Sequence, residues 1–274
     1  MPNPTTITHV TSAWTRAAVA AIAEQALPSI PVITAGDLKD VLPGFQLWDC
    51  WPFETPQGAT VVLDGWTPWV IMCAPRDLHP DLRHDVARLR LMLERDGDWR
   101  DCGYLLPDDL NPGSREWAGS TVHDPATGQV TLFYTATGRR GDTGRSFEQR
   151  LFQTSGMLEH VDGLVRVVGW SDPVESVAAD GQHYVIVNQS VGQPGFIKGF
   201  RDPFHFRDPA DGTDYLLFTA SDAGSDAAFN GVVGVARASC AGFAEWSLLP
   251  PLVSANSVNN EMERPVLRVQ DGRY

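Results

Sequence analysis

The chain has 274 residues, of which 43% are hydrophobic and 20% are charged. This length and composition are typical of one large globular domain, or two small ones, with a substantial buried core. The formal net charge of −13 argues against a nucleic-acid partner, because phosphates require basic patches. No apolar run approaches the roughly 20 residues that a membrane-spanning helix needs, so neither nucleic acid nor membrane is an expected partner.

The N-terminal region is expected to be helical. Trp14, Ala18 and Ile22 recur at helical spacing within residues 12–25, and a second short helix is expected at 35–41. Because no basic region precedes it, the apolar stretch at 17–23 is interpreted as an amphipathic helix and not as a signal peptide. The location of the protein therefore stays open between the cytoplasm and secretion by a signal-independent route. We expect residues 1–40 to form a helical segment that packs on a domain comprising residues 41–274.

From residue 41 onwards the sequence is typical of an all-β fold. Short apolar runs, rich in β-branched and aromatic residues, alternate with clusters of Gly, Pro, Asp and Asn. Expected strands lie at 59–63, 69–72, 88–94, 129–135, 184–187 and 215–219. The four cysteines are far apart and have no metal-ligand spacing, so we expect free thiols packed as small apolar groups.

A repeated unit predicts how these strands are arranged. Residues 124–136 and 208–220 are similar without a gap, and each consists of an Asp-Pro-Ala turn followed by an apolar strand. A polar or aromatic motif precedes these two turns and two further turn glycines at similar distances. The motif residues are Asp49, Trp117, Asp202 and Glu263. Small sheets repeated radially form a β-propeller, which would bring these residues to one end of a central channel. A two-sheet sandwich, the alternative, would scatter them.

The fourth unit ends at residues 271–274, where its second strand should start. Radial closure of a propeller is expected to need that hairpin and a further blade. We therefore expect the propeller to be incomplete at its C-terminus.

Two motifs place an aspartate in a setting that suits glycoside chemistry. Asp49 lies between two tryptophans, which can stack on sugar faces while the carboxylate attacks an anomeric carbon; an aromatic core pair beside a turn-capping aspartate is the alternative. Asp202 follows Arg201, whose charge is expected to lower the pKa of the carboxyl group and keep it ionised. A surface ion pair at a turn is the alternative here. The second Arg-Asp-Pro copy, at 207–209, coincides with the repeated turn and is interpreted as structural.

Two further motifs complete the set. Glu261 and Glu263 are two residues apart, so in a strand they would point to the same face, and mutual repulsion would raise the pKa of one of them. A solvated strand edge is the alternative. Trp117 offers another stacking face, and residues 118–120 are small enough to leave room for a ligand or, alternatively, to pack closely. Two carboxylates flanking a glycosidic bond are the standard arrangement for glycoside cleavage, so three at repeated positions point to that chemistry.

In this order, the four motifs resemble those of the levansucrase, inulosucrase and β-fructofuranosidase family, glycoside hydrolase family 68. The matching segments are Trp-Asp-Cys-Trp-Pro at 48–52, Glu-Trp-Ala-Gly-Ser at 116–120, Arg-Asp-Pro at 201–203 and Glu-Met-Glu-Arg at 261–264. The related invertase family carries Asn-Asp-Pro-Asn-Gly and Glu-Cys-Pro motifs, and neither is present. The resemblance extends from about residue 14 to the end of the chain.

The resemblance implies a five-bladed propeller whose last blade is incomplete or missing in this chain. It implies Asp49 as nucleophile, Asp202 as transition-state stabiliser and Glu263 as acid/base in a retaining transfer of fructosyl from sucrose to water, sucrose or fructan. It requires no metal or other cofactor, and a monomer is expected. The candidate substrate-binding residues are Trp48, Trp117, Ala118, Ser120, Arg201, Glu261 and Arg264.

Two other functions stay open on the sequence. A propeller glycosidase of the arabinanase type also uses three acids but acts on arabinosides or xylosides. A catalytically inactive fragment would bind carbohydrate without turnover. The family's sequence continues past Glu-Arg-Pro and includes an arginine and a tyrosine that help to shape the sugar site, so this second alternative applies above all to a chain that ends at Tyr274.

Overall fold

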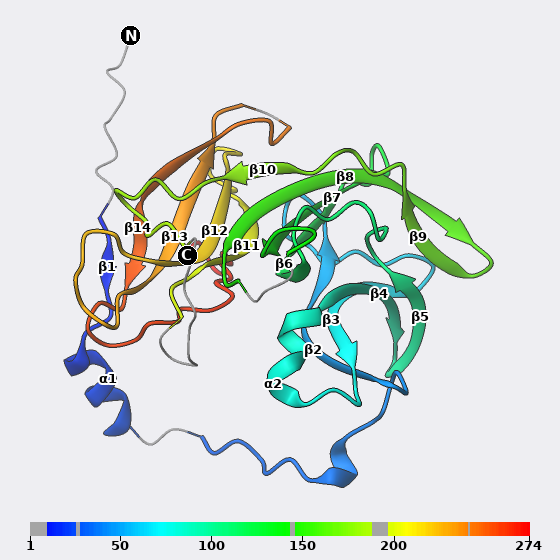
Figure 1. The fold of residues 1–274 in the computed structure, drawn as a ribbon, viewed down its shortest axis with the longest axis horizontal. Helices are drawn as coiled ribbons and strands as arrows, with labels where there is room; N and C mark the ends of the chain where they lie inside the picture. The colour runs from blue at the N-terminus through cyan, green and yellow to red at the C-terminus, as the bar shows by residue number, and fades with distance from the viewer. Residues whose placement is uncertain (1–9, 26–27, 143–145, 188–196, 241) are drawn as a thin grey trace.

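The computed structural model describes residues 10–274 except 26–27, 143–145, 188–196 and 241. Most strands belong to three consecutive antiparallel sheets, which we call blades 1, 2 and 3 (Figure 1). Blade 1 contains β2 (Phe45–Glu54), β3 (Thr67–Pro75), β4 (Arg88–Arg95) and β5 (Asp98–Tyr104). Blade 2 contains β6 (Arg115–His123), β7 (Gln129–Thr137) and β8 (Gln149–Val161), with β9 (Leu164–Val168) and β10 (Val174–Val177) both paired to β8. Blade 3 contains β11 (Phe200–Arg207), β12 (Asp214–Ser221), β13 (Gly231–Ala238) and β14 (Trp246–Ser254).

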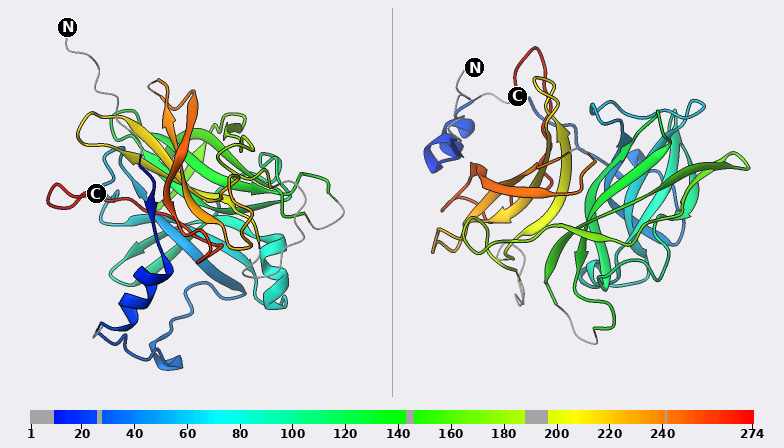
Figure 2. Two further views of the ribbon diagram at one scale, coloured as in Figure 1. Left: turned by 90° about the vertical axis from the view of Figure 1, so that its left-hand side faces the viewer. Right: turned by 90° about the horizontal axis from the view of Figure 1, so that it is seen from above.

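The blades follow one another in space as they do in the chain. Strands β2 and β6 pair in parallel through Phe53↔Thr121 and Glu54↔Val122, which joins blades 1 and 2 into one continuous sheet. Blade 3 forms a separate sheet that lies beside it (Figure 2). This radial succession of small antiparallel sheets is the propeller arrangement predicted from the repeat, and the all-β class is confirmed. A total of five blades stays a prediction.

Apolar side chains fill the spaces between neighbouring blades. Phe53, Leu89 and Leu132, which are fully buried, belong to the cluster shared by blades 1 and 2. Phe200 and Phe218 belong to the cluster shared by blades 2 and 3. Because the alternate residues of each strand point to opposite faces, every blade can bury one face against each neighbour. The inner strands β2, β6 and β11 are thereby fixed relative to one another.

Each inner strand carries a β-bulge at its motif. The register shifts between Trp48 and Cys50 in β2, between Trp117 and Gly119 in β6, and between Arg201 and Phe204 in β11. One extra residue in each strand is left out of the ladder, and such a residue can be aimed away from the sheet face. The bulged positions are Asp49, Ala118 and the Asp202–Pro203 pair. In blade 2 the counterpart of Asp49 at the bulge is therefore Ala118, one residue after the predicted motif residue Trp117.

The repeated turn is confirmed in both copies. The Asp124 peptide N–H donates to the Gln129 carbonyl at 2.9 Å, and the Asp208 N–H donates to the Thr213 carbonyl at 2.8 Å. In each turn the aspartate carboxylate accepts a hydrogen bond from the peptide N–H two residues later, at 2.9 Å and 2.8 Å. These side-chain contacts stabilise a tight turn. The two copies connect β6 to β7 and β11 to β12.

Replacing Gly119 with alanine is expected to destabilise the fold strongly. A Cβ atom at this position would lie 1.9 Å from the Phe133 carbonyl oxygen, which belongs to the backbone of β7 and cannot rotate away. We expect Gly119→Ala to lower the free energy of unfolding by more than about 3 kcal/mol, at or beyond the upper end of ordinary overpacking. Urea unfolding followed by tryptophan fluorescence measures this change. Gly36→Ala, at an exposed site whose nearest atom is 3.7 Å away, is the control, and similar losses in both variants would contradict the argument.

The N-terminal segment is attached to blade 3. Strand β1 (Ser12–Ala13) pairs in parallel with β14. Helix α1 (Arg16–Ala23) follows and is capped by Thr15, whose hydroxyl accepts from the Ala18 N–H at 3.1 Å. All α1 side chains are exposed, and the chain then runs to blade 1 through the short 3-10 helix η1 (Ala35–Asp37) (Figure 1). Residues 1–9 and 26–27 of the predicted N-terminal segment lie outside the described residues. A division of the chain at residue 40 stays a prediction.

Three expected strands are not formed. Residues 59–63 make only isolated bridges, because left-handed turns at Gly58 and at Asp64–Gly65 fold this short stretch onto β2. Residues 184–187 make one bridge, through Tyr184, whose ring is fully buried and whose hydroxyl donates to the Leu249 carbonyl at 2.6 Å. The segment after Glu263 forms only the bridge Gln270↔Arg273. The prediction of strands was wrong at these places because apolar composition does not show whether a segment has a ladder partner; Val62 and Ile186, for example, are 61% and 54% exposed.

The cysteines are free, as expected, but they do not share one environment. Cys73 is buried within β3, whereas Cys50 and Cys240 are exposed and Cys102 is partly buried. The expectation that they pack as small apolar groups therefore holds for Cys73, holds only partly for Cys102, and was wrong for Cys50 and Cys240.

Candidate active site

One cavity of about 630 Å³ lies where the motif-bearing ends of the inner strands meet. It collects side chains from β2, β6, β11 and the segment at 260–264, which we call the C-terminal motif segment. Eight of the ten residues predicted from the sequence line it, namely Asp49, Trp117, Ala118, Arg201, Asp202, Glu261, Glu263 and Arg264. The two others, Trp48 and Ser120, do not.

Asp49 lies at the bulge of β2, with 39% of its side chain exposed to the cavity side. Its Oδ1 atom lies 3.2 Å from Nη1 of Arg264. The other guanidinium nitrogen, Nη2, donates to the Cys50 carbonyl at 2.7 Å. Arg264 therefore ties the C-terminal motif segment to β2 and orients the Asp49 carboxylate toward the cavity.

Asp202 is buried at the bulge of β11, where its backbone adopts a left-handed conformation with φ of 61°. Its Oδ2 accepts a hydrogen bond from the Thr219 hydroxyl at 3.0 Å and lies 3.6 Å from Nε of Arg201. Burial raises the pKa of the Asp202 carboxyl to about 6, although Arg201 and Thr219 oppose the rise; Glu263 and Asp49 add to it. Arg201 lowers this pKa as predicted, but the expected net result was wrong, because burial outweighs the ion pair and the pKa of Asp202 lies above its ordinary value.

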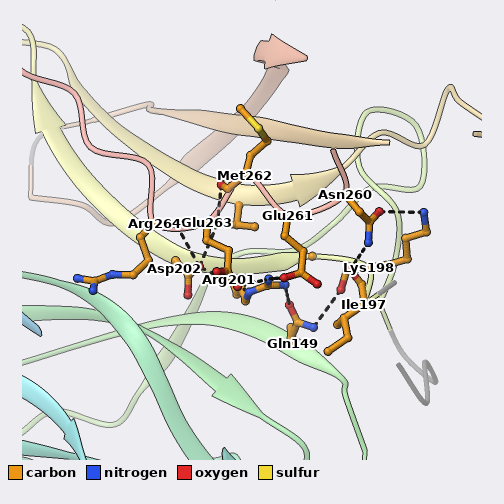
Figure 3. Close-up of polar contacts among 12 residues, drawn as sticks. Gln149, Ile197, Lys198, Arg201, Asp202, Asn260, Glu261, Met262, Glu263 and Arg264 are labelled. Atoms are coloured by element: carbon orange, nitrogen blue, oxygen red, sulfur yellow. Dashed lines mark hydrogen bonds and ion pairs between the residues drawn. The ribbon is translucent and has the colours of Figure 1, made fainter. Parts of the chain in front are cut away.

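Arg201 is buried and faces three carboxylates (Figure 3). Its Nη2 donates to Glu263 at 2.7 Å and lies 3.7 Å from Glu261, while its Nε faces Asp202. Its Nη1 also donates to the Gln149 side-chain oxygen at 3.4 Å. A guanidinium has five donors in a fixed plane, so one buried arginine can hold several acceptors in a set geometry. Arg201 is thus the shared cation of the site.

The C-terminal motif segment is held without strand pairing. Asn260 is buried and donates to the Ile197 carbonyl at 2.7 Å, and the ammonium of Lys198 lies 3.2 Å from the Asn260 side-chain oxygen (Figure 3). Glu261 and Glu263 are not in a strand, so the strand argument for their common direction was wrong. They nevertheless face the same guanidinium, because Nη2 of Arg201 lies 3.7 Å from Glu261 and 2.7 Å from Glu263.

The aromatic residues differ in their roles. Trp117 lines the cavity, and its indole N–H donates to the His84 carbonyl at 3.0 Å. Trp48 lies behind the cavity wall and packs against the His84 ring, with ring centroids 5.3 Å apart. Ser120 lies away from the cavity, and its hydroxyl accepts from the His205 N–H at 3.0 Å. Because Ser120 thereby joins blade 2 to blade 3, we assign it a structural role in place of the predicted substrate contact.

Sequence reasoning missed one part of the cavity wall. His84, Asp81 and Asp85 line it from the helical connection between β3 and β4, made of α2 (Pro80–Arg83) and the 3-10 helix η2 (His84–Val86). The available indication was the length of this connection, because long ordered loops on a β scaffold often carry functional residues. Phe147 and Ile197 also line the cavity, and no pattern in the sequence distinguished them.

Glu116, beside Trp117, is a buried carboxyl with few partners. One oxygen accepts from the Leu89 N–H at 2.8 Å, and the other lies 3.5 Å from Nε of Arg88. Burial raises the pKa of Glu116 to about 7 against these two contacts. Since the carboxyl binds its proton more tightly in the folded chain, its contribution to stability is lost as the pH rises from about 4.5 to about 7.

Replacing Glu116 with glutamine is expected to remove this pH dependence. A pKa raised from 4.5 to about 7 corresponds to about 3 kcal/mol in the free energy of unfolding. As the pH rises from about 4 to about 8, wild type should lose up to this amount of stability through Glu116, and the variant should not. Urea unfolding at a series of pH values measures the difference. Glu24→Gln, just after the exposed helix α1, is the control. Parallel stability curves for wild type and Glu116→Gln would contradict the assignment.

Two absences concern the described part of the chain. Among those residues, no group of three or more His, Cys, Asp or Glu side chains is placed to hold a metal ion. None of the described helices is long and apolar enough to cross a membrane.

Comparison with known proteins identifies the family. Residues 4–230 and 224–274 match the family model described as levansucrase/invertase. A levansucrase of Rahnella aquatilis is 29% identical over 98% of this chain and 72% of its own length, and one of Zymomonas mobilis is 31% identical over 95% and 66%. An extracellular sucrase of Zymomonas mobilis is 29% identical over 95% and 68%.

Solved structures show the same relationship. The inulosucrase of Halalkalicoccus jeotgali bound to kestose superposes with a TM-score of 0.83 and 35% identity, over 96% of this chain and 66% of its own. The levansucrase of Bacillus subtilis, with a TM-score of 0.78 and 20% identity over 99% and 72%, shares the fold. The chain spans about two thirds of the length of these relatives. With the family model matched along nearly its whole length, the chain belongs to the levansucrase/invertase family of glycoside hydrolases.

Proposed function

We propose that this chain carries the site of a retaining fructosyltransferase that cleaves sucrose and transfers the fructosyl unit to water, sucrose or a fructan. One observation carries the proposal: Asp49, Asp202 and Glu263, from two blades and the C-terminal motif segment, line the same cavity. The names of the relatives, levansucrase, inulosucrase and extracellular sucrase, give the substrate class. Because the chain spans about two thirds of those relatives, its own activity is part of the proposal.

The first step forms a bond between Asp49 and the fructosyl anomeric carbon. Glu263 donates its proton to the glycosidic oxygen as the bond to glucose breaks, and neutral glucose leaves. Arg264 is placed to orient Asp49, since its Nη1 lies 3.2 Å from the carboxylate. Trp117 provides an aromatic wall of the cavity.

The second step returns Asp49 to its free form. Glu263 takes the proton from the acceptor hydroxyl, the acceptor oxygen bonds to the anomeric carbon, and the bond to Asp49 breaks. Arg201 suits this change of protonation, because Glu261 lies 3.7 Å from the guanidinium nitrogen that holds Glu263 at 2.7 Å. The guanidinium can therefore pair with Glu261 whenever Glu263 carries the proton.

Asp202 is the proposed stabiliser of the transition state. An ionised carboxylate in a buried setting attracts the positive charge of an oxocarbenium-like sugar more strongly than one in water does. With the pKa of Asp202 raised to about 6 by burial, this form is lost as the pH falls through that value. The proposed activity should decline on the acid side at that point.

The test of the function is the release of glucose and free fructose from sucrose. Glucose in excess of fructose indicates transfer to an acceptor sugar, and equal amounts indicate hydrolysis. A parallel assay with aryl arabinosides addresses the arabinanase alternative. Release of arabinose with no glucose from sucrose would overturn the proposal, and fructan binding without turnover of any substrate would indicate a chain that only binds.

A further inference from the structure

Two threonines occupy the same position of the repeated turn-and-strand unit. Thr135 in β7 and Thr219 in β12 are both completely buried. Each pairs with the residue just before the bulge of its own inner strand, namely Trp117 for Thr135 and Arg201 for Thr219. The corresponding partner in blade 1, opposite Trp48, is Met72, which has no hydroxyl group.

Both hydroxyls join one motif to the next. The Thr135 hydroxyl donates to the Ala118 carbonyl at 3.0 Å and accepts from the Asp202 N–H at 2.9 Å. The Thr219 hydroxyl accepts from the Arg264 N–H at 3.1 Å. It also lies 3.0 Å from the Met262 carbonyl and 3.0 Å from Oδ2 of Asp202. Thr219 therefore reaches a catalytic candidate's carboxylate, whereas Thr135 reaches only backbone atoms.

The Thr219 hydroxyl has one proton and two acceptors. A hydroxyl donates a single hydrogen bond, so Asp202 and the Met262 carbonyl compete for it. An ionised carboxylate is the stronger acceptor, because charge assistance roughly doubles the strength of a hydrogen bond. When Asp202 takes up a proton this advantage disappears, and the Met262 carbonyl, at the same distance of 3.0 Å, becomes a comparable acceptor for the hydroxyl.

We propose that Thr219 is a positioning residue of the active site: its hydroxyl holds the Asp202 carboxylate against the backbone that carries Glu263 and thereby keeps the two carboxyl groups in register. The inference deepens the proposed function and rests on it for its catalytic meaning. The physical coupling itself is a property of the folded chain and is open to measurement whether or not sucrose is cleaved.

The surroundings of Asp202 determine what removal of the hydroxyl does. Arg201 at 3.6 Å is the facing cation, and Glu263 and Asp49 are the facing anions. The Arg264 N–H, at 3.4 Å, points at the same oxygen. Without the Thr219 donor, the carboxylate keeps its burial and both anions but loses one of its stabilising contacts, so its affinity for a proton rises.

The experiment follows the titration of Asp202 by carbon-13 NMR of chains labelled at the aspartate carboxyl carbon, with Asp202→Asn used to assign the signal. Thr219→Val, which keeps the shape and removes the hydroxyl, should raise the titration midpoint by about one pH unit. Thr219→Ser, which keeps the hydroxyl, should restore it. Thr135→Val is the matched control, because it removes an equally buried hydroxyl that does not touch the carboxylate, and its midpoint should stay near that of wild type.

A second readout is the pH dependence of glucose release from sucrose. The acid limb of kcat should move to higher pH in Thr219→Val together with the NMR midpoint, and Thr219→Ser should reverse both. An unchanged midpoint in Thr219→Val, or an equal rise in Thr135→Val, would overturn the inference. Should the valine variant not fold, Thr219→Cys, whose thiol is a weak donor, carries the same expectation. If Thr219→Val shifts the Asp202 midpoint in a chain that cleaves no sucrose, the proposed function is rejected, but the coupling between Thr219 and Asp202 is supported.

Discussion

Asp49→Asn is expected to abolish sucrose cleavage while the fold and the cavity persist. The amide cannot form the covalent bond to the anomeric carbon, and losses of a nucleophile of this kind reach about 10⁶-fold in kcat. We expect a fall of more than about 10⁴-fold. Asparagine has nearly the same shape as aspartate and its oxygen can still accept from Arg264, which lies 3.2 Å from Oδ1 of Asp49. Glucose release in a coupled assay measures the loss, and urea unfolding checks the fold.

A covalent adduct provides the direct test of this role. In wild-type chain quenched with acid during turnover, mass spectrometry should find a fructosyl group on the peptide that contains Asp49, and Asp49→Asn should show none. Asp64→Asn, in the same blade with 91% of its side chain exposed, is the control and should keep both the rate and the adduct. An Asp49→Asn chain that turns over sucrose at the wild-type rate would rule out Asp49 as nucleophile.

Glu263→Gln should reduce kcat by about 10²–10⁴-fold, the range typical of general acid–base catalysis. Sucrose binding should stay close to that of wild type, because the glutamine side chain keeps an oxygen that can accept from Arg201, whose Nη2 now lies 2.7 Å from Glu263. The rate falls because the variant has no carboxyl group at position 263, so the leaving glucose oxygen has no proton donor. Calorimetry of sucrose binding and the initial rate of glucose release separate the two effects.

A substrate with a good leaving group shows whether Glu263→Gln lacks only the proton donor or has a distorted active site. A fructoside whose leaving group needs no protonation should be cleaved by Glu263→Gln at a rate much closer to that of wild type, and slow regeneration of Asp49 should then produce a burst. Glu261→Gln is the matched control on the same guanidinium, and its loss should appear in KM more than in kcat. Equal slowing of both substrates in Glu263→Gln would indicate that Glu263 only maintains the structure.

The convergence of the site could be predicted from the sequence because it follows from the repeat. Asp49, Asp202 and Glu263 lie far apart in the chain but precede similar turns, and a radial fold brings such positions together. The sequence did not show that Ala118, and not Trp117, takes the bulged position in β6. A bulge adds one residue locally and leaves no trace in the composition of the strand. Bulges depend on how two strands meet, and that information lies in the partner strand.

Electrostatic details were beyond the sequence for a different reason. The neighbour Arg201 is visible in the chain, but the burial of Asp202 is a property of the packed blades, and burial decides the direction of the pKa. The place of His84 in the cavity wall was indicated only by the length of the connection between β3 and β4, because a single histidine in a polar stretch carries no periodicity. The place of Ser120 outside the cavity wall could not be predicted either, since a small residue beside a motif looks the same whether it lines a cavity or joins two blades.

The bulges also allow the residue at the cavity to vary without a change in strand pairing. Before each bulge the pairs are Trp48↔Met72, Trp117↔Thr135 and Arg201↔Thr219, and beyond each one the ladder resumes. The extra residue takes no place in the ladder, so the same frame accommodates Asp49 in one blade and Ala118 in the next without a change of register. In evolutionary terms, the blades could therefore diverge at the bulged residue, which lines the cavity, while the strands around it kept the same pairing.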